Sequence, residues 1–233
     1  MSVLLMRLAG PLQSWGASSR FSRRSTEAAP TKSGVIGLLA AALGRQRTDD
    51  LADLAALRFG VRTDQRGVLL RDFQTAHHFA TGDAQPISDR YYLADAVFVA
   101  GVEGDAELID DLLAALRCPV FLPYLGRRSC PPARPLELGA DHEHALEQAL
   151  RDVPWQAAPW HQRRRRHDQQ IDLEILVEAT PAEGGGDSLR DQPLSFDPLH
   201  RRYALRGVRR IPVSVPNPVA LPVHDPTSLL EGA

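Results

Sequence analysis

The sequence has 233 residues, with 27 basic and 29 acidic side chains and a hydrophobic content of 43%. That length can bury one large or two small cores, and the hydrophobic content excludes a mainly disordered chain. No apolar run approaches the roughly 18 residues that a membrane span needs, so no membrane association is expected. The apolar N-terminus is too short for a signal peptide, and the two cysteines make no disulfide framework. We therefore expect a cytoplasmic protein.

Hydrophobic periodicity predicts the following elements in the first half of the chain. They are a buried strand at 3–8, a loop at 10–31, a helix at 33–43, strands at 58–63 and 68–75 paired across a turn, a polar excursion at 76–90, a strand at 91–102, a helix at 106–116 and a strand beginning at 120–122. The order β-α-β-β-α-β with one insertion is that of an α+β, ferredoxin-like (RRM-like) domain, in which both helices cover one face of an antiparallel sheet.

The character of the sequence changes after about residue 135. A short helix is predicted at 142–150, and strands at 171–177 and 202–206 flank a glycine-rich loop. Four prolines lie between 216 and 226. We expect three regions: residues 1–135 as the ferredoxin-like domain, 136–215 as a smaller β-rich domain, and 216–233 as a flexible proline-rich tail.

Positive charge is concentrated at the N-terminus although the whole chain is nearly neutral. Residues 1–48 hold seven basic side chains and one acidic one, which gives a local charge of +6. An excess of arginine over lysine explains the residue type but not the shortage of acids. A basic face on a neutral protein is typical of a surface that binds a polyanion.

The predicted helix at 33–43 begins with features of a phosphate site. Lys32 and Ser33 precede Gly34 and Gly37, so positive charge and backbone N–H groups meet at a helix N-terminus. The stretch lacks the glycines of a nucleotide-binding P-loop, which makes nucleotide hydrolysis improbable. Two hypotheses stay open with equal weight: close approach of a ligand backbone to the glycines, or close packing of the helix on the sheet.

Two further segments are candidates for contact with a phosphate-bearing strand. In the first, a tryptophan that either stacks on a base or fills the core lies among polar and basic residues: Gln13, Ser14, Trp15, Gly16 and Arg20. In the second, a glycine beside two arginines offers backbone amides and guanidinium groups to a phosphate: Gly126, Arg127, Arg128 and Ser129.

Catalytic and metal chemistry receive little support. Cys118, Cys130, His142 and His144 do not have zinc-ligand spacing, so we predict no metal site and no cofactor. A metal-free ribonuclease would need an acid–base pair beside a phosphate, and the candidates Lys32, His77, His78, Tyr91 and Tyr92 form no clear pair. The basic run 161–167 is most simply a solvated segment, although it is able to touch nucleic acid non-specifically.

Four motifs carry a family resemblance. They are LMRLAGPLQSWG at 5–16, PTKSGVIGLL at 30–39, LRDFQT at 70–75 and PYLGRRSCP at 123–131. In this order they resemble the CasD family of type I-E CRISPR Cascade subunits, within the RAMP superfamily. The resemblance covers residues 3 to about 135, and its last motif is highly specific.

The resemblance implies a ferredoxin-like domain with an inserted thumb hairpin and a smaller β-rich domain. It implies a non-catalytic, RNA-binding subunit of the antiviral surveillance complex that caps the 5′ handle of the CRISPR RNA (crRNA). The backbone subunit and the large subunit are the implied protein partners, and target DNA is contacted only indirectly through the complex. In a related subtype the equivalent protein is an endoribonuclease that processes precursor CRISPR RNA, which remains the alternative.

Carried onto this sequence, the resemblance places the thumb at about residues 76–90. Its RNA contacts would be Arg71, Gln74, His77, His78 and Arg90. The expected tip at 81–86 has no aromatic residue, so the part inserted into the RNA would be Phe79, Ile87 or the backbone alone. The handle would lie over 13–16, Arg20, 32–37 and 126–129.

Overall fold

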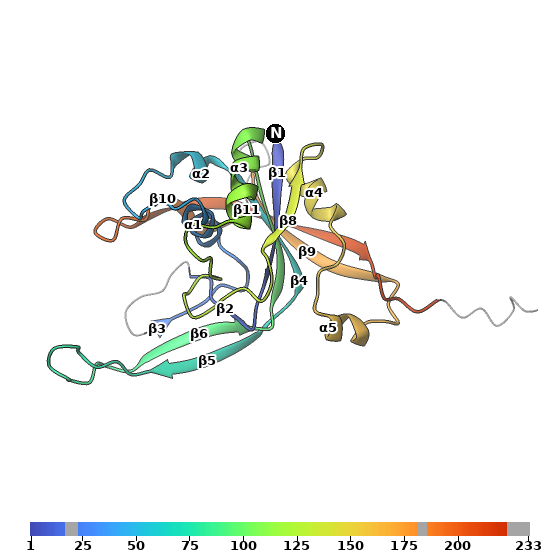
Figure 1. The fold of residues 1–233 in the computed structure, drawn as a ribbon. Coiled ribbons are helices and arrows are strands. Elements are labelled where there is room, and N and C mark those ends of the chain that lie inside the picture. Colours follow the sequence, from blue (N-terminus) through green and yellow to red (C-terminus); the bar gives the residue numbers. More distant parts are fainter. Residues whose placement is uncertain (17–22, 181–185, 223–233) are drawn as a thin grey trace, which may run out of the picture.

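The computed structural model describes residues 1–16, 23–180 and 186–222. Its helices are α1 (Lys32–Ala42), α2 (Ala52–Ala56), α3 (Ala106–Arg117), α4 (Leu146–Asp152) and α5 (Pro159–Arg164). Its strands are β1 (Ser2–Ala9), β2 (Leu12–Gln13), β3 (Arg23–Arg24), β4 (Arg58–Gln65), β5 (Val68–Gln74), β6 (Ser88–Ala94), β7 (Val97–Gly104), β8 (Glu137–Asp141), β9 (Gln170–Glu178), β10 (Asp187–Ser195) and β11 (Arg202–Pro216). Figure 1 shows their arrangement.

A curved, seven-stranded sheet with the order β10-β11-β9-β4-β7-β1-β8 organises the fold (Figure 1). Every neighbouring pair in it is antiparallel. The expected mixture of helices with an antiparallel sheet is therefore confirmed. Strands β9, β10 and β11, from the region predicted as a second domain, extend the same sheet beyond β4.

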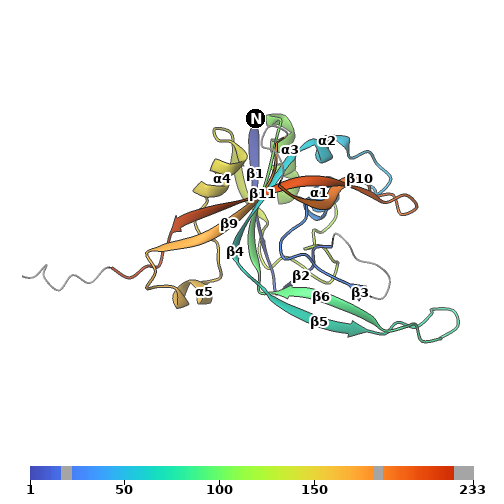
Figure 2. The same cartoon turned by 180° about the vertical axis from the view of Figure 1, so that it is seen from behind.

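The two faces of this sheet bury two different cores because successive side chains of a strand point in opposite directions. Leu4 and Met6 of β1 belong to one apolar cluster with α1, α2 and α3. Val3 and Leu5 belong to a second cluster with α4 and Trp155. Helices α1 and α3 thus lie on one face and α4 on the other, as the two opposite views in Figures 1 and 2 show.

The β5–β6 hairpin projects from the main body (Figures 1 and 2). Strand β6 pairs with β5 along its whole length, while β2 and the parallel β3 pair with its other edge. Asp95 has a left-handed φ of 56° between β6 and β7, where the chain turns from the hairpin back into the main sheet. The loop 75–87 at the hairpin tip is almost fully exposed.

Three predictions about individual elements are wrong. Strand β4 pairs with β7 and β9 rather than with β5, because β5 leaves the main sheet to join β6. The single strand expected at 91–102 is divided at Asp95 between two sheets. Residues 120–122 form an irregular loop, and the strand beside β1 is β8 at 137–141.

The helix beginnings follow local sequence rules. The Oγ1 of Thr31 accepts a hydrogen bond from Gly34 N at the start of α1, and Asp105 caps α3 in the same way through Glu107 N. Residues 217–222, at the start of the predicted tail, are held by hydrogen bonds: Asn217 N donates to Gln169 O and Leu221 N to Arg166 O. The rest of that tail, 223–233, lies outside the described residues.

Candidate nucleic-acid interface

A groove of about 1150 Å³ lies on the α1 side of the sheet and brings the separate candidate segments together. Half of the predicted RNA-binding residues line it. They are Ser14, Trp15, Gly16, Ser33, Gly34, Gly37, Gly126, Arg127 and Arg128. Three segments that are distant in the sequence therefore form one surface.

The loop 123–131 is held against the segment 14–16 by backbone contacts. Ser14 N donates to Leu125 O over 3.1 Å, and Leu125 N donates to Cys130 O over 2.8 Å. Gly126 has a φ of +82°, and a Cβ on it would lie only 1.8 Å from Ser14 O. Glycine is required here because a side chain would meet both an unfavourable backbone conformation and the opposite backbone. The close contact places Arg127 and Arg128 at the groove wall.

Arginines dominate the charge of the groove. Six of them line it, and no acidic side chain does so among the described residues: Arg24, Arg45, Arg47, Arg127, Arg128 and Arg201. Arg45 forms an ion pair with Asp53, which reduces its availability. Arg127 lies 4.8 Å from the centre of the Tyr92 ring and donates to Arg24 O. Arg24, Arg47, Arg128 and Arg201 are exposed, so several cations are accessible to an anionic ligand.

Aromatic side chains complete the groove. Tyr124, Phe121, Phe196 and Tyr203 line it together with the arginines. Phe196 and Tyr203 lie 6.4 Å apart, and burial raises the pKa of the Tyr203 hydroxyl. Phe196 approaches Gly37, where a Cβ would lie 3.6 Å from its ring. Cations interleaved with aromatic rings are typical of surfaces that bind single-stranded nucleic acid.

The predicted phosphate site at the start of α1 is wrong in its details. Lys32 N donates to Asp191 Oδ2 over 2.8 Å, and Gly34 N donates to Thr31 Oγ1. The carboxylate of Asp191 therefore occupies the position that an anionic ligand would take at this helix N-terminus. Close packing explains Gly34, because a Cβ there would lie 2.8 Å from the Trp15 ring.

The Lys32 side chain is likewise unavailable to RNA. It is 1% exposed, and its Nζ forms an ion pair with Glu178 over 3.0 Å. Burial lowers the pKa of Lys32, and the nearby Glu178 carboxylate opposes that shift. Lys32 does not line the groove.

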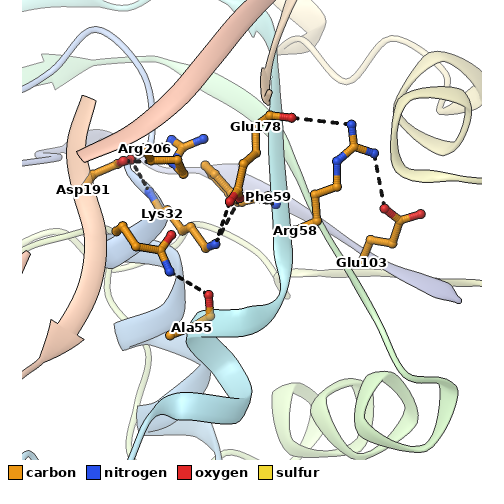
Figure 3. A network of polar contacts seen from close by, with 9 residues as sticks. Lys32, Ala55, Arg58, Phe59, Glu103, Glu178, Asp191 and Arg206 are labelled. Atoms are coloured by element: carbon orange, nitrogen blue, oxygen red, sulfur yellow. Dashed lines mark hydrogen bonds and ion pairs between the residues drawn. The ribbon is translucent and has the colours of Figure 1, made fainter. Parts of the chain in front are cut away.

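A buried polar network joins this part of α1 to the C-terminal strands (Figure 3). Asp191 accepts two hydrogen bonds from Arg206, at 2.9 and 2.8 Å, in addition to the one from Lys32 N. Glu178 also accepts from Phe59 N over 3.2 Å. The network fixes β10 and β11 against α1, and thereby places Arg201 and Tyr203 at the groove.

Base stacking on Trp15 is excluded by its position. The ring is fully buried, and its Nε1 donates to Gln13 Oε1 over 3.0 Å. Gln13 is also buried, and its Nε2 donates to Leu8 O and Ala96 O. Both side chains therefore support the segment from inside the core, and the Ser14 hydroxyl donates to Tyr91 O in the same way.

The remaining predicted residues lie elsewhere. Ser129 is exposed next to the buried Cys130 but does not line the groove. Arg20 lies outside the described residues. The five hairpin residues are separate from the groove and are Arg71, Gln74, His77, His78 and Arg90.

On the hairpin, Arg71 forms an exposed ion pair with Asp89 over 3.0 Å. The Nδ1 of His77 lies 3.0 Å from Gly82 O, and the Nδ1 of His78 accepts from Thr81 N. Both histidines stay exposed at the tip, with the fully exposed Phe79 beside them. Arg90 is half-buried, and its Nε has no hydrogen-bond partner among the described residues.

The ribonuclease candidates do not converge on one centre. Lys32 is buried in an ion pair at α1, whereas His77 and His78 lie at the tip of the projecting hairpin. Tyr92 is buried, and Arg23 lies over the Tyr91 ring at 5.3 Å. Within the described ranges, no group of three or more potential metal ligands is found.

Sequence reasoning missed part of the groove. Arg24, Arg45 and Arg47 were counted in the basic N-terminal segment, but their common surface depends on the paths of the chain before and after α1. Phe196, Arg201 and Tyr203 gave no signal, because only the folding of β10 and β11 over α1 brings them there.

Comparison with known proteins confirms the family resemblance. A family model described as CRISPR-associated protein (Cas_Cas5) matches residues 3–209. The chain belongs to this family of CRISPR-associated proteins. It is 39% identical over 171 residues to the CRISPR system Cascade subunit CasD of Escherichia coli (strain K12), which covers 64% of this chain and 75% of that protein.

Solved structures agree with this assignment. One, described as the crystal structure of a Cas protein, is 40% identical with a TM-score of 0.71, covering 94% of this chain and 97% of the other. Another belongs to a CRISPR RNA-guided surveillance complex and is 34% identical with a TM-score of 0.75, covering 94% and 92%. In the described part of the chain, none of the helices has the length and apolar character to cross a membrane.

Proposed function

We propose that this chain is a non-catalytic crRNA-binding subunit of a CRISPR RNA-guided surveillance complex, and that its groove caps the 5′ handle. The observation that carries the proposal is the groove, where six arginines meet the rings of Phe121, Tyr124, Phe196 and Tyr203 without an acidic side chain among the described lining residues. The similarity to CasD and to a subunit of a surveillance complex supports the same function.

In this proposal the exposed arginines hold the phosphates of the handle. Arg128 and Arg201 line the groove from two segments that are distant in the sequence, and their guanidinium groups are able to bind phosphate oxygens in bidentate fashion. Tyr203 and Phe196 provide ring faces for unpaired bases. Because the loop 123–131 is fixed by backbone hydrogen bonds, the backbone that carries Arg127 and Arg128 loses little entropy on binding.

The topology supports a ferredoxin-like assignment for the N-terminal part. The order β4-β7-β1-β8, with α1 and α3 on one face, is the order that a β-α-β-β-α-β unit adopts. We propose that the β5–β6 hairpin is the thumb, with its tip inserted into the RNA beside the handle. The division into a domain at 1–135 and a β-rich domain at 136–215 remains a prediction.

The protein partners proposed for this chain are the backbone subunit and the large subunit of the complex. Target DNA would be contacted indirectly through the assembly. Apolar side chains on the hairpin favour a protein contact there, since Val68, Leu69 and Phe73 are each more than 60% exposed.

The test compares handle-RNA binding by variants of equal charge loss. Each lost phosphate contact reduces the slope of log affinity against log salt concentration by about 0.7. Two lost contacts therefore predict that R128Q/R201Q binds about tenfold more weakly at 0.15 M salt. The matched control R117Q/R190Q removes two exposed arginines that do not line the groove. Equal affinity of the two variants at both low and moderate salt would contradict the assignment of the groove.

A further inference from the structure

A second basic surface lies on the other face of the sheet, formed by α5 and the turn that follows it. Four consecutive arginines, Arg163–Arg166, cover the end of α5 and the start of this turn, and all four are exposed. Figures 1 and 2 place α5 beside β9 and away from α1 and the β5–β6 hairpin. The groove proposed for the handle therefore does not include it.

The arginine run is held rigidly rather than forming a loose solvated loop. The side chain of Asn217 donates to Arg165 O and to Asp168 O, each over 2.8 Å. Leu221 N donates to Arg166 O over 2.8 Å, so the C-terminal segment clamps the backbone of the turn. A fixed backbone lowers the entropic cost of using several neighbouring arginines at once.

The opposite end of α5 is anchored to the sheet. Ala158 N donates to Gln65 Oε1 over 3.0 Å, and Trp155 Nε1 donates to Asp64 O over 2.8 Å. The ring centre of His161 lies 5.8 Å from that of Trp155 and 5.4 Å from that of Trp160, and both pairs are T-shaped. The helix thus has a defined orientation relative to β4.

Much of the positive charge on this surface is not neutralised. Asp168 forms an ion pair with Arg165. Among the residues that the structure describes, no acidic side chain forms an ion pair with Arg163, Arg164 or Arg166. Burial lowers the pKa of His161, and the positive charges of Arg165 and Arg164 lower it further.

An aromatic residue, Trp160, precedes Arg163 and Arg164 by three and four positions on α5, the spacing at which helical side chains are neighbours. Trp160 is 41% exposed, although tryptophan is usually buried. An exposed indole beside unpaired guanidinium groups suits a single strand, because its unpaired bases stack on the ring while its phosphates bind the arginines. The bases of a duplex are already stacked and do not offer that contact.

We propose that the α5 surface, defined as Trp160, Arg163, Arg164 and Arg166, binds a single-stranded nucleic-acid segment distinct from the handle. The binding is independent of base sequence, since it uses phosphates and ring stacking only. The proposal does not depend on the function of the groove, because the two surfaces lie on opposite faces of the sheet.

The experiment measures binding of the full-length protein to a labelled single strand that lacks the handle sequence. R163Q/R164Q is expected to bind this strand about tenfold more weakly at 0.15 M salt. Because two phosphate contacts are lost, the slope of log affinity against log salt concentration should fall by about 1.4. The control R117Q/R190Q has the same charge loss elsewhere and is expected to bind like the parent protein. W160L, which removes the ring and keeps the arginines, is expected to weaken binding by about fivefold or more.

A photoreactive thymidine analogue in the same strand locates the contact. Crosslinks to residues 159–167, together with the expected loss of affinity, would support the proposal. Crosslinks confined to other segments, or an R163Q/R164Q affinity equal to that of the control, would overturn it. Binding of a duplex as tightly as the single strand would also overturn it. Binding of handle RNA by R163Q/R164Q is measured in parallel, because a loss there would concern the groove and not the α5 surface.

Discussion

Replacing Gly126 by alanine tests how the groove wall is built. The left-handed backbone at this position costs a non-glycine residue about 1–2 kcal/mol. The new Cβ would also lie 1.8 Å from Ser14 O, a contact so short that one backbone must move. That movement breaks the hydrogen bond from Ser14 N to Leu125 O, which contributes about 1 kcal/mol. The shift of the backbone itself costs about 1 kcal/mol more, so we expect a total loss of about 3–4 kcal/mol in the free energy of unfolding.

Gly82 provides a matched control. It also has a positive φ, of +75°, but a Cβ there would meet nothing within 4 Å. G82A therefore carries the backbone cost without the collision, and we expect it to lose about 1–2 kcal/mol. For a chain of this size, 1 kcal/mol corresponds to about 2–4 °C in Tm.

Thermal unfolding of the two variants, followed by circular dichroism, measures the difference. We expect G126A to lower Tm by about 6–16 °C and G82A by about 2–8 °C. The folded fraction of G126A should also bind handle RNA more weakly, because Arg127 and Arg128 move with the loop. Equal Tm shifts for the two variants would refute the argument that close approach to Ser14 requires glycine at position 126.

Three other variants test separate parts of the structure. W15F removes the indole N–H that donates to Gln13 Oε1, so we expect Tm to fall by about 4–8 °C. The RNA affinity of the folded protein should not change. A loss of affinity without a loss of stability would instead indicate that Trp15 stacks on a base. K32M leaves the Glu178 carboxylate without its ion-pair partner and should cost about 3 kcal/mol in unfolding free energy, measured by denaturant titration. The pKa of Lys32 is lower in the folded state than in the unfolded chain, so the unfolded chain binds more protons at pH values between the two. The stability of the wild type relative to K32M should therefore increase as the pH rises through this window. A decrease would contradict the assignment. F79S alters a fully exposed side chain, so Tm should not change, whereas affinity for RNA extending beyond the handle should fall by about fivefold if the hairpin tip stacks on it.

The sequence predicted the elements with strong periodicity and the segments that meet in the groove. Helix α1 was expected at 33–43 and lies at 32–42, and α3 was expected at 106–116 and lies at 106–117. Gly126, Arg127 and Arg128 do lie beside Ser14–Gly16, as the shared motifs indicated. Local patterns were sufficient in these cases because the elements or motifs are specified by nearby residues.

Long-range pairing was the part that the sequence did not reveal. Asp191 lies 159 positions after Lys32 and yet accepts its backbone N–H, which no local pattern indicates. Lys32 was predicted to contact RNA, but in the structure it is a buried cation that forms an ion pair within this network. Trp15 likewise gave no sign in the sequence that Gln13 would bind its indole N–H inside the core.

The most direct test of the central claim is binding of labelled crRNA with and without its 5′ handle, at two salt concentrations, with the RNA length checked on a denaturing gel. We expect the protein to retain the handle-bearing RNA intact and more tightly than the handle-free RNA, with an affinity that falls steeply as salt increases. Discrete cleavage of precursor RNA in the presence of EDTA would contradict the non-catalytic function and favour the endoribonuclease. Equal affinity for both RNAs would contradict recognition of the handle by this chain.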